Sequence, residues 1–451
     1  MRAIRKSVPG LLAALAVVLF FTPQARAELV PDGYNPKGLP TVGCFWTGPF
    51  TASNDLTNMA YPGTEITYWG AKFRTPPGAV LKLRGFYPHA RYSSLNAYES
   101  SGGIPTGSIS DRQIRPDRGS VNTSLPGRDR RAKKRSWTVR VVGSQAPSNP
   151  ARNTLYAAPS EDAYQDILYR VYVPDKGRTL SGGTGIPRPE LILADGTVLS
   201  GQALCHALNS NHNYVSNPLP LPLYNNLVNW PGKDPLTNPA TPTFSFIKFF
   251  NLGQSMARYK SDEDFAATWA ANPVEQGTLY ANNDARYMTG AISLRYGKVV
   301  VIRGSMPTTP RTFQGNRRAQ GGQLVEWDMC TIESLATTRT HRCLFDEQVP
   351  LKGVKRRYTI VVSLAADRPW NAKRKCGVAW LPADPDGDGA GRPDSQLLLT
   401  RNVIPSASFR HSIQDVTTPF NAARIMGRFY PRGSYTGKAA FQRLGCPKAG
   451  I

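Results

Sequence analysis

The amino-acid sequence predicts a mainly β protein made of two tandem, duplicated β-sandwich-like (jelly-roll-like) units joined by a connector of loops and helices. Glycine (40 residues) and proline (38 residues) are too frequent for a bundle or solenoid of helices. Several short blocks alternate apolar and polar residues with the period of two that is typical of strands. Three such blocks recur later in the chain in the same order. The 8 Trp, 19 Tyr and 17 Phe give enough apolar surface to offset the chain entropy that folding removes.

The repeat appears at nearly constant offsets. The block YPGTEITYWGAKFRTPPGAVLKLRGFYP, starting at Tyr61, returns 219 positions later as YANNDARYMTGAISLRYGKVVVIRGSMP, starting at Tyr280. KKRSWTVRVV matches VKRRYTIVVS at an offset of 221, and LYRVYVP matches LTRNVIP at an offset of 231. The larger last offset follows from the acidic loop ADPDGDGAGRP, which only the second copy carries. We therefore predict two similar units, each burying one face against its own core or against its twin.

The individual elements follow from local patterns. AVLKLRG, WTVRVV and YTIVV alternate apolar and polar residues and predict strands. Helices are expected for SDEDFAATWAAN, with Ser261 as N-cap, and for SFRHSIQDV from Ser408. Residues 201–272 have no counterpart in either copy and predict a connector with a Pro-rich loop, SNPLPLPLYNN, and one or two helices. The resulting division is a signal peptide (1–27), a first β unit (28–200), the connector (201–272) and a second β unit (273–451).

The N-terminus has the parts of a secretory signal peptide. Arg2, Arg5 and Lys6 precede the apolar stretch 11–21, and a small-residue site ends at Ala27. This stretch is shorter than the roughly 20 residues that span a bilayer. We therefore expect a secreted or periplasmic protein with no transmembrane segment after signal removal. In an oxidising compartment the six cysteines predict disulfides, with fifteen connectivities open. The spacing of Cys330 and Cys343 suits a staple across two neighbouring strands.

The duplication suggests a way to sort candidate functional residues. Residues kept in both copies are expected to be architectural: Arg84 and Arg303 hold a strand end or a turn, and Gly85 and Gly304 supply permissive dihedral angles. Residues of one copy are freer to act on a ligand. The insertion ESSGGIPTGSISDRQIRPDRGSVN in the first unit predicts either a polar groove for an oligosaccharide or peptide, or an ordered loop that covers a sheet edge. The candidate ligand-binding residues are Tyr92, Tyr98, Arg115, Asp117 and Arg118.

The run DPDGDG, residues 384–389, resembles the first half of a calcium loop. Carboxylates at alternate positions converge on a hard cation, and glycine permits a sharp turn. The second half differs, because position twelve is Ser395 and not a bidentate glutamate. Two interpretations therefore stand: a structural calcium held by Asp384, Asp386 and Asp388, or a solvated acidic turn.

No common catalytic signature is present, so the catalytic residues are unknown and enzyme activity is undecided. The sequence contains no H-E-x-x-H, G-x-S-x-G or C-x-x-C motif, and none of the five histidines stands in such a context. The formal net charge is +24. The basic clusters RDRRAKKR (128–135) and KGVKRR (352–357) precede equivalent strands and predict either one electropositive end that attracts polyanions or ordinary solvated loops. No nucleic-acid-binding module accompanies them.

Several segments resemble known sequences. FYPHARYSSLNAYES, ISDRQIRPDRGSVN and RYTIVVSLAADRPWNAKRKCGVAWLP are similar to a group of exported bacterial proteins of unknown function, over most of the mature chain. YANNDARY with the following strand resembles the domain-of-unknown-function family numbered twelve fifty-four. These resemblances imply secretion and β architecture, and they imply no activity. The leading hypothesis is an exported, non-catalytic binding or structural protein that contacts anionic envelope or extracellular polymers. The alternative is a hydrolase or lyase that acts on such a polymer in a cleft between the units.

Overall fold

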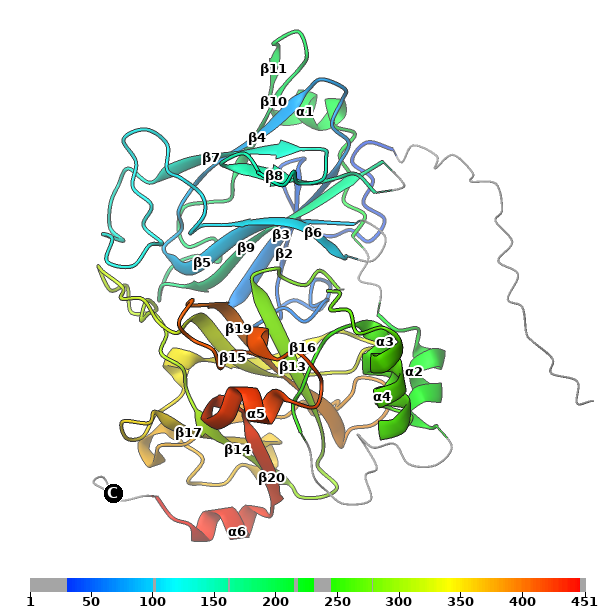
Figure 1. The fold of residues 1–451 in the computed structure, drawn as a ribbon, viewed down its shortest axis with the longest axis vertical. Helices are drawn as coiled ribbons and strands as arrows, with labels where there is room; N and C mark the ends of the chain where they lie inside the picture. The colour runs from blue at the N-terminus through cyan, green and yellow to red at the C-terminus, as the bar shows by residue number, and fades with distance from the viewer. Residues whose placement is uncertain are drawn as a thin grey trace, which may run out of the picture. The chain divides into compact units, whose positions relative to one another are not determined.

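The computed structural model describes residues 31–99, 103–160, 163–214, 218–230, 245–277 and 279–446. They belong to one compact body. The predicted signal peptide, residues 1–27, lies outside the described residues. The fold is mainly β, as predicted, and consists of four sheets arranged as layers (Figure 1).

The first β unit contributes a six-stranded sheet, β1-β2-β3-β9-β5-β6, and a five-stranded sheet, β11-β10-β4-β7-β8. Its strands are β1 (Thr41–Val42), β2 (Trp46–Phe50), β3 (Ile66–Phe73), β4 (Val80–Phe86), β5 (Ala90–Tyr98), β6 (Pro105–Ser110), β7 (Ser136–Val142), β8 (Thr154–Tyr156), β9 (Gln165–Pro174), β10 (Arg188–Ile192) and β11 (Val198–Leu199).

The second β unit contributes a five-stranded sheet, β12-β13-β19-β15-β16, and a four-stranded sheet, β18-β17-β14-β20. Its strands are β12 (Ile247–Lys248), β13 (Ala285–Ser293), β14 (Val299–Ser305), β15 (Leu324–Ile332), β16 (Thr340–Phe345), β17 (Arg357–Ser363), β18 (Ala379–Pro382), β19 (Ser395–Pro405) and β20 (Arg432–Thr436).

The two units share one topology. The order β3-β9-β5-β6 in the first unit is repeated as β13-β19-β15-β16 in the second, and β10-β4-β7-β8 is repeated as β20-β14-β17-β18. The pairs β7-β8 and β17-β18 are both parallel, whereas the other pairs are antiparallel. The three repeated sequence blocks fall on β3–β4 and β13–β14, on β7 and β17, and on β9 and β19.

Each unit is a sandwich, and the inner sheets of the two sandwiches also pack against each other. Leu81, Val139 and Ile167 belong to the core between the two sheets of the first unit, and Val300, Ile360 and Leu398 to that of the second. A third cluster, which includes Tyr172 and Val403, joins the inner sheets. We call this contact the junction. Strands β5 and β15 are therefore buried along their whole length. The residues of β4, by contrast, alternate between buried and more exposed positions.

The connector contains more helix than predicted. Its helices are α1 (Gly201–Ala207), α2 (Leu221–Val228), α3 (Leu252–Ala257) and α4 (Asp262–Ala271). Helix α4 begins after Ser261, whose side chain accepts a hydrogen bond from the Asp264 amide, as expected. The predicted Pro-rich loop is wrong in part, because α2 forms within it. Pro222 lies in the first turn, where an amide hydrogen is not needed.

The helix expected from Ser408 is also wrong. Only the short 3₁₀ turn η4 (Ile413–Asp415) forms there, closed by Ser412 and Asp415. The remaining helical turns are η1 (Asp346–Gln348), η2 (Ala365–Asp367), η3 (Arg374–Cys376), α5 (Ala422–Met426), η5 (Gly427–Phe429) and α6 (Lys438–Arg443). No helix among the described residues is long and apolar enough to cross a membrane.

The repeated glycines have a different role from the predicted one. Neither Gly85 nor Gly304 adopts a positive φ angle. A Cβ atom at Gly85 would lie 2.4 Å from Cζ2 of Trp137, and one at Gly304 would lie 2.6 Å from the hydroxyl of Tyr358. Both glycines therefore make room for an aromatic ring on the neighbouring strand, β7 or β17.

The cysteines pair as Cys44–Cys205, Cys330–Cys343 and Cys376–Cys446. Cys330 and Cys343 face each other on β15 and β16, which confirms the predicted staple across two neighbouring strands. Cys205 on α1 ties the start of the connector to the first unit, and Leu204 and Leu208 join the core of that unit.

Candidate functional site

The predicted ligand-binding residues do not share one groove. Tyr92 and Tyr98 on β5 are completely buried. The Tyr92 hydroxyl donates to Oδ2 of Asp284 at 2.8 Å, and both rings thus face the second unit across the junction. By contrast, Arg115 and Arg118 are exposed and Asp117 is half-buried in the loop after β6. Because the two rings are enclosed, they offer no surface to a ligand that lies against this loop.

The acidic loop holds the connector in place. The carboxylate of Asp388 accepts hydrogen bonds from the Ala390 and Arg392 amides and, at 2.9 Å, from the hydroxyl of Tyr224 on α2. Asp384 accepts from the Asp386 amide. Among the described residues, the oxygens of Asp384, Asp386 and Asp388 do not form a group within 4.8 Å of one another. The loop thus engages its carboxylates with protein donors, as in an acidic turn.

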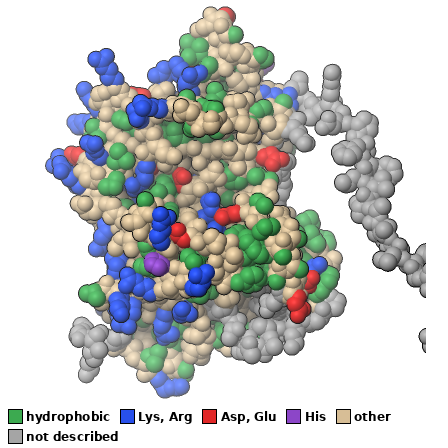
Figure 2. All heavy atoms as spheres, viewed as in Figure 1, with side chains coloured by type: hydrophobic (Ala, Val, Ile, Leu, Met, Phe, Trp, Pro, Cys, Tyr) green, Lys and Arg blue, Asp and Glu red, His purple; other side chains and the backbone are tan. Residues whose placement is uncertain are grey.

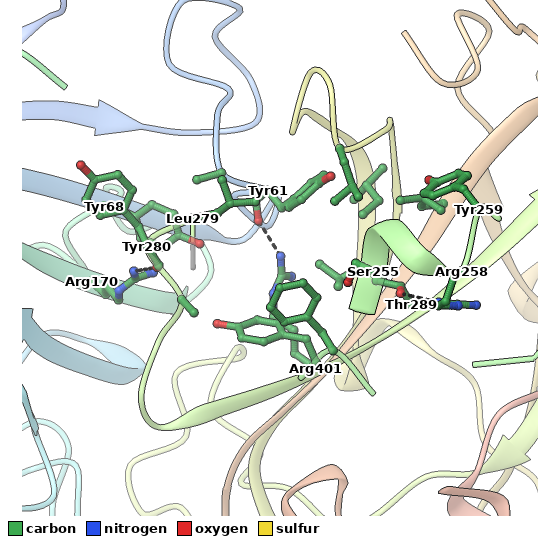
Figure 3. Close-up of a pocket in the computed structure, with 18 residues that line it drawn as sticks. Tyr61, Tyr68, Arg170, Ser255, Arg258, Tyr259, Leu279, Tyr280, Thr289 and Arg401 are labelled. Atoms are coloured by element: carbon green, nitrogen blue, oxygen red, sulfur yellow. Dashed lines mark hydrogen bonds between the residues drawn. The ribbon is translucent and has the colours of Figure 1, made fainter. Parts of the chain in front are cut away.

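The junction contains a cavity of about 80 Å³ (Figure 3). Strands β3 and β9 of the first unit, β13, β15 and β19 of the second, and helix α3 all contribute to its wall. The apolar part of the lining is formed by Ala60, Phe249, Leu279, Ala281, Ile332, Leu335, Leu397 and Leu399. The polar part is dominated by Tyr61, Tyr68, Tyr259, Tyr280, Tyr287, Arg170, Arg258 and Arg401. Among the described residues that line the cavity there is no carboxylate and no histidine.

Residues that correspond in the repeat face each other across this cavity. Tyr61 and Tyr280, 219 positions apart, both have a positive φ angle, so their carbonyl groups turn out of the extended direction. Arg401 Nη2 donates to the Tyr61 carbonyl at 2.6 Å, and Arg170 Nη2 donates to the Tyr280 carbonyl. Each unit thus supplies an arginine that holds the corresponding loop of the other unit, and Figure 3 shows both contacts.

The two arginines differ in their counter-ions. Arg401 is paired across the strands with Asp328, and its Nη1 lies 2.5 Å from the Asp328 carboxylate. Arg170 is paired in the same way with Ser94. No described carboxylate lies within 4.0 Å of the Arg170 guanidinium. Arg170 is nevertheless only 2% exposed.

The surroundings of Arg170 compensate its charge only in part. Its Nη2 donates to the Tyr98 hydroxyl at 2.5 Å, and its Cζ lies 4.3 Å from the centre of the Tyr68 ring. Its Nε has no hydrogen-bond partner among the described residues. Burial raises the pKa of Tyr68 above its usual value, so this ring is neutral and attracts the cation only through its π face. A buried cation without an anion costs several kcal/mol.

A second feature is a basic surface beside the junction. The loop 126–134 of the first unit packs on the loop 311–320 of the second, where the Gly127 amide donates to Ala319 and the Arg130 amide to Arg317. The exposed cations of this surface are Arg128, Arg131, Lys133, Lys134, Lys176, Arg178, Arg311, Arg317 and Arg318. Figure 2 shows many Lys and Arg side chains on the left of the face in view, where these loops lie in Figure 1.

The predicted cluster 128–135 is split between surface and interior. Arg130 pairs with Asp175 at 2.5 Å, and Arg135 lies 2.6 Å from Nε2 of His89. Burial and the adjacent Arg135 lower the pKa of His89 to about 4, so this histidine is neutral at neutral pH. In the other predicted cluster, Arg356 donates to the carbonyls of Met306 and Pro307. Some of the predicted basic residues therefore have structural partners, and the others remain at the surface.

Comparison with known proteins finds no matching family model and no matching curated protein. Among solved structures, an uncharacterised protein from Burkholderia cenocepacia is similar, with 11% identity and a TM-score of 0.46, over 89% of this chain and 84% of that chain. The VPA0106 protein from Vibrio parahaemolyticus has 10% identity and a TM-score of 0.36, over 83% of this chain and 90% of that chain. These likenesses say nothing of a ligand or a reaction.

The sequence contains a usable indication of the cavity. Tyr61, Tyr68 and Arg170 have matches in the repeat at Tyr280, Tyr287 and Arg401. From the sequence we expect residues kept in both copies to be architectural, and this expectation excludes these tyrosines and arginines from the candidate ligand-binding residues. An arginine retained at the same place in two matching strands is the feature that could have identified the cavity from sequence.

Proposed function

We propose that this protein is an exported, non-catalytic binding protein whose junction cavity takes a small molecule with an apolar body and one anionic group. The observation that carries the proposal is Arg170, a buried cation in the cavity wall without a carboxylate partner. In the second unit Asp328 neutralises the equivalent arginine, whereas Ser94 leaves Arg170 uncompensated. A bound carboxylate would supply the missing anion and would accept from the free Nε hydrogen.

The size of the cavity restricts the ligand. Its volume of about 80 Å³ is several times the ~15 Å³ that one water molecule needs. It therefore suits a compact molecule, such as a small aromatic carboxylate, better than a polymer chain. The aromatic and aliphatic lining favours an apolar body, as in most small-molecule sites.

Export is the second part of this proposal. Its support is the predicted signal peptide, together with the three disulfides, which are typical of proteins in oxidising compartments. The absence of acids and histidines from the described cavity lining favours binding over the alternative hydrolase or lyase, because general acid-base chemistry needs such groups beside the substrate.

The cavity proposal predicts a preference for anions that depends on Arg170. Titration calorimetry with benzoate and with its neutral analogue benzamide is expected to show at least tenfold tighter binding of benzoate, or about 1.4 kcal/mol. Arg170→Met should remove this preference, because methionine has a side chain of similar length but no charge. Ser94→Asp should also remove it, because the new carboxylate would pair with Arg170 as Asp328 pairs with Arg401.

Arg115→Gln is the matched control, since Arg115 is an exposed arginine far along the chain from the cavity lining. This variant should bind benzoate like the unchanged protein. Equal binding of benzoate and benzamide by the unchanged protein, or an anion preference that survives in both Arg170→Met and Ser94→Asp, would refute the proposal.

The basic surface supports a second candidate function, attachment to anionic envelope or extracellular polymers. Exposed cations from both units lie together on the loops 126–134 and 311–320. The one acidic residue in these two loops, Asp129, is already paired with Arg317 at 2.7 Å. A surface of this kind attracts polyanions, and the attraction weakens as salt increases.

This second candidate predicts that retention on heparin depends on position and not on net charge alone. Changing Arg131, Lys133 and Lys134 to Ser should lower the salt concentration of elution clearly. Changing the exposed cations Lys375, Arg410 and Arg443 to Ser removes the same charge elsewhere and should have a smaller effect. Equal shifts for the two triple variants would mean that the surface has no special role.

A further inference from the structure

Three carboxylates from both β units meet at the junction. Glu65 precedes β3 of the first unit, and Glu326 and Asp328 lie two positions apart, on one face of β15 of the second. One oxygen of each residue lies within 4.8 Å of the others. Glu326 and Asp328 have no exposed surface, and Glu65 is half-buried.

Several oxygens of this group have no donor. Neither oxygen of Glu326 has a hydrogen-bond partner among the described residues, and the same holds for Oδ1 of Asp328 and Oε1 of Glu65. Native proteins rarely leave buried polar atoms without partners, so each such atom requires an explanation. A completely buried glutamate with two free oxygens, directed at two further carboxylates, points to a ligand that supplies positive charge.

The charges define what that ligand must carry. The cation that contacts the group is Arg401, which pairs with Asp328. Arg91 acts electrostatically on Glu326, but its guanidinium is already bonded to Asp346 and Glu347. When all three carboxylates are ionised, they and Arg401 together carry a charge of −2, which one divalent cation would balance.

We propose that Glu65, Glu326 and Asp328 bind one divalent metal ion that prefers oxygen ligands, such as Ca²⁺, Mg²⁺ or Mn²⁺. Carboxylate oxygens are the ligands these ions favour. The neighbouring Cys330 and Cys343 form a disulfide, so they offer no thiolate to a softer metal. Because the ligands come from both β units, the ion would connect the units beside the cavity. This site is distinct from the predicted calcium loop at Asp384, Asp386 and Asp388.

The test uses the full mature chain, stripped with a chelator and then supplied with Mn²⁺, Ca²⁺ or Mg²⁺. We expect one equivalent of at least one of these ions by elemental analysis after dialysis. At a hundredfold excess over Kd the ion should raise the unfolding midpoint by about 3 °C. In Glu326→Gln, both the bound equivalent and the rise in the midpoint should disappear.

Two further variants make the result specific. Asp111→Asn changes another buried carboxylate, which accepts from the Ser93 amide, and should keep the metal-dependent rise. Asp384→Asn should keep it as well. No bound equivalent with any of the three ions, a rise that persists in Glu326→Gln, or a rise that disappears only in Asp384→Asn would overturn the proposal. In the first of these outcomes protons, and not a metal, neutralise the carboxylates.

Discussion

Replacing Arg91 by methionine is expected to lower the free energy of unfolding by about 3–5 kcal/mol. Arg91 lies on β5 of the first unit and is 2% exposed. Its guanidinium bonds to the carboxylates of Asp346 and Glu347 on η1 of the second unit, and its Nε donates to Thr312 at 3.2 Å. Removing this one cation leaves two enclosed carboxylates without a counter-charge, and this cost greatly exceeds the cost of the lost side-chain packing.

The loss should depend on pH in a defined direction. Burial raises the pKa of Asp346, and Arg91 opposes that effect. Without Arg91 the folded-state pKa rises further above the unfolded-state value. A raised carboxyl pKa costs stability as the pH increases through it, so the deficit should be larger at pH 8 than at pH 5. Urea unfolding at the two pH values measures this difference.

An exposed ion pair provides the matched control. Arg84 pairs with Glu190 at 3.0 Å, with side-chain exposures of 54% and 26%. Arg84→Met should cost less than about 1 kcal/mol, because water already solvates both groups. The double change Arg91→Met and Asp346→Asn should recover part of the loss. Equal effects of Arg91→Met and Arg84→Met would show that the buried network does not hold the units together.

Much of the architecture could be predicted because the repeat preserves local patterns. The alternation in VLKLRG marks β4, whose alternate residues face the core and the exterior. The same alternation marks β7 and predicts β17, whereas only the repeat of LYRVYVP as LTRNVIP matches β9 with β19. Turn residues and an N-cap such as Ser261 act over a few positions, so the printed sequence shows them directly.

The junction could not be predicted in the same way. Polar residues such as Ser94, Asn96 and Asp328 occupy buried positions on strands that carry a second layer of protein on their outer face. In sequence they look like the solvent-facing half of an alternating strand. Many of the contacts at the junction join distant positions: Asn96 accepts from the Asn283 amide 187 positions away, and the Arg91–Asp346 pair spans 255 positions. The arrangement of two whole units decides these contacts, and no local pattern encodes it.

The separation of candidate residues into repeated and unique ones failed for a related reason. Two similar units that pack through equivalent sheets bring equivalent residues together at their interface. Arg170 and Arg401 therefore face one cavity because both are repeated. What distinguishes them is a third position, Ser94 in one unit and Asp328 in the other. In a duplicated fold, the informative positions include the unlike neighbours of repeated residues.

Removing the disulfide Cys44–Cys205 is expected to destabilise the protein more than removing Cys330–Cys343. The first bond closes a segment of 161 residues, and the second closes one of 13. If disulfides act mainly by restricting the unfolded chain, these lengths correspond to about 5 and about 3 kcal/mol. The folded state adds to the difference. Cys330 and Cys343 lie on strands that stay paired without the bond, whereas Cys205 lies on the short helix α1.

The comparison uses the double variants Cys44→Ala/Cys205→Ala and Cys330→Ala/Cys343→Ala, unfolded in guanidinium chloride without reductant. We expect the lower midpoint for the first variant, with benzoate binding retained by both under native conditions. The cavity draws its residues mainly from β3, β9, β13 and β19, with Ile332 from β15, and sheet pairing holds these strands in place without the bonds. If the Cys330→Ala/Cys343→Ala variant were the less stable, local support of β15 and β16 would outweigh chain entropy, and the staple would be the main covalent support of the junction.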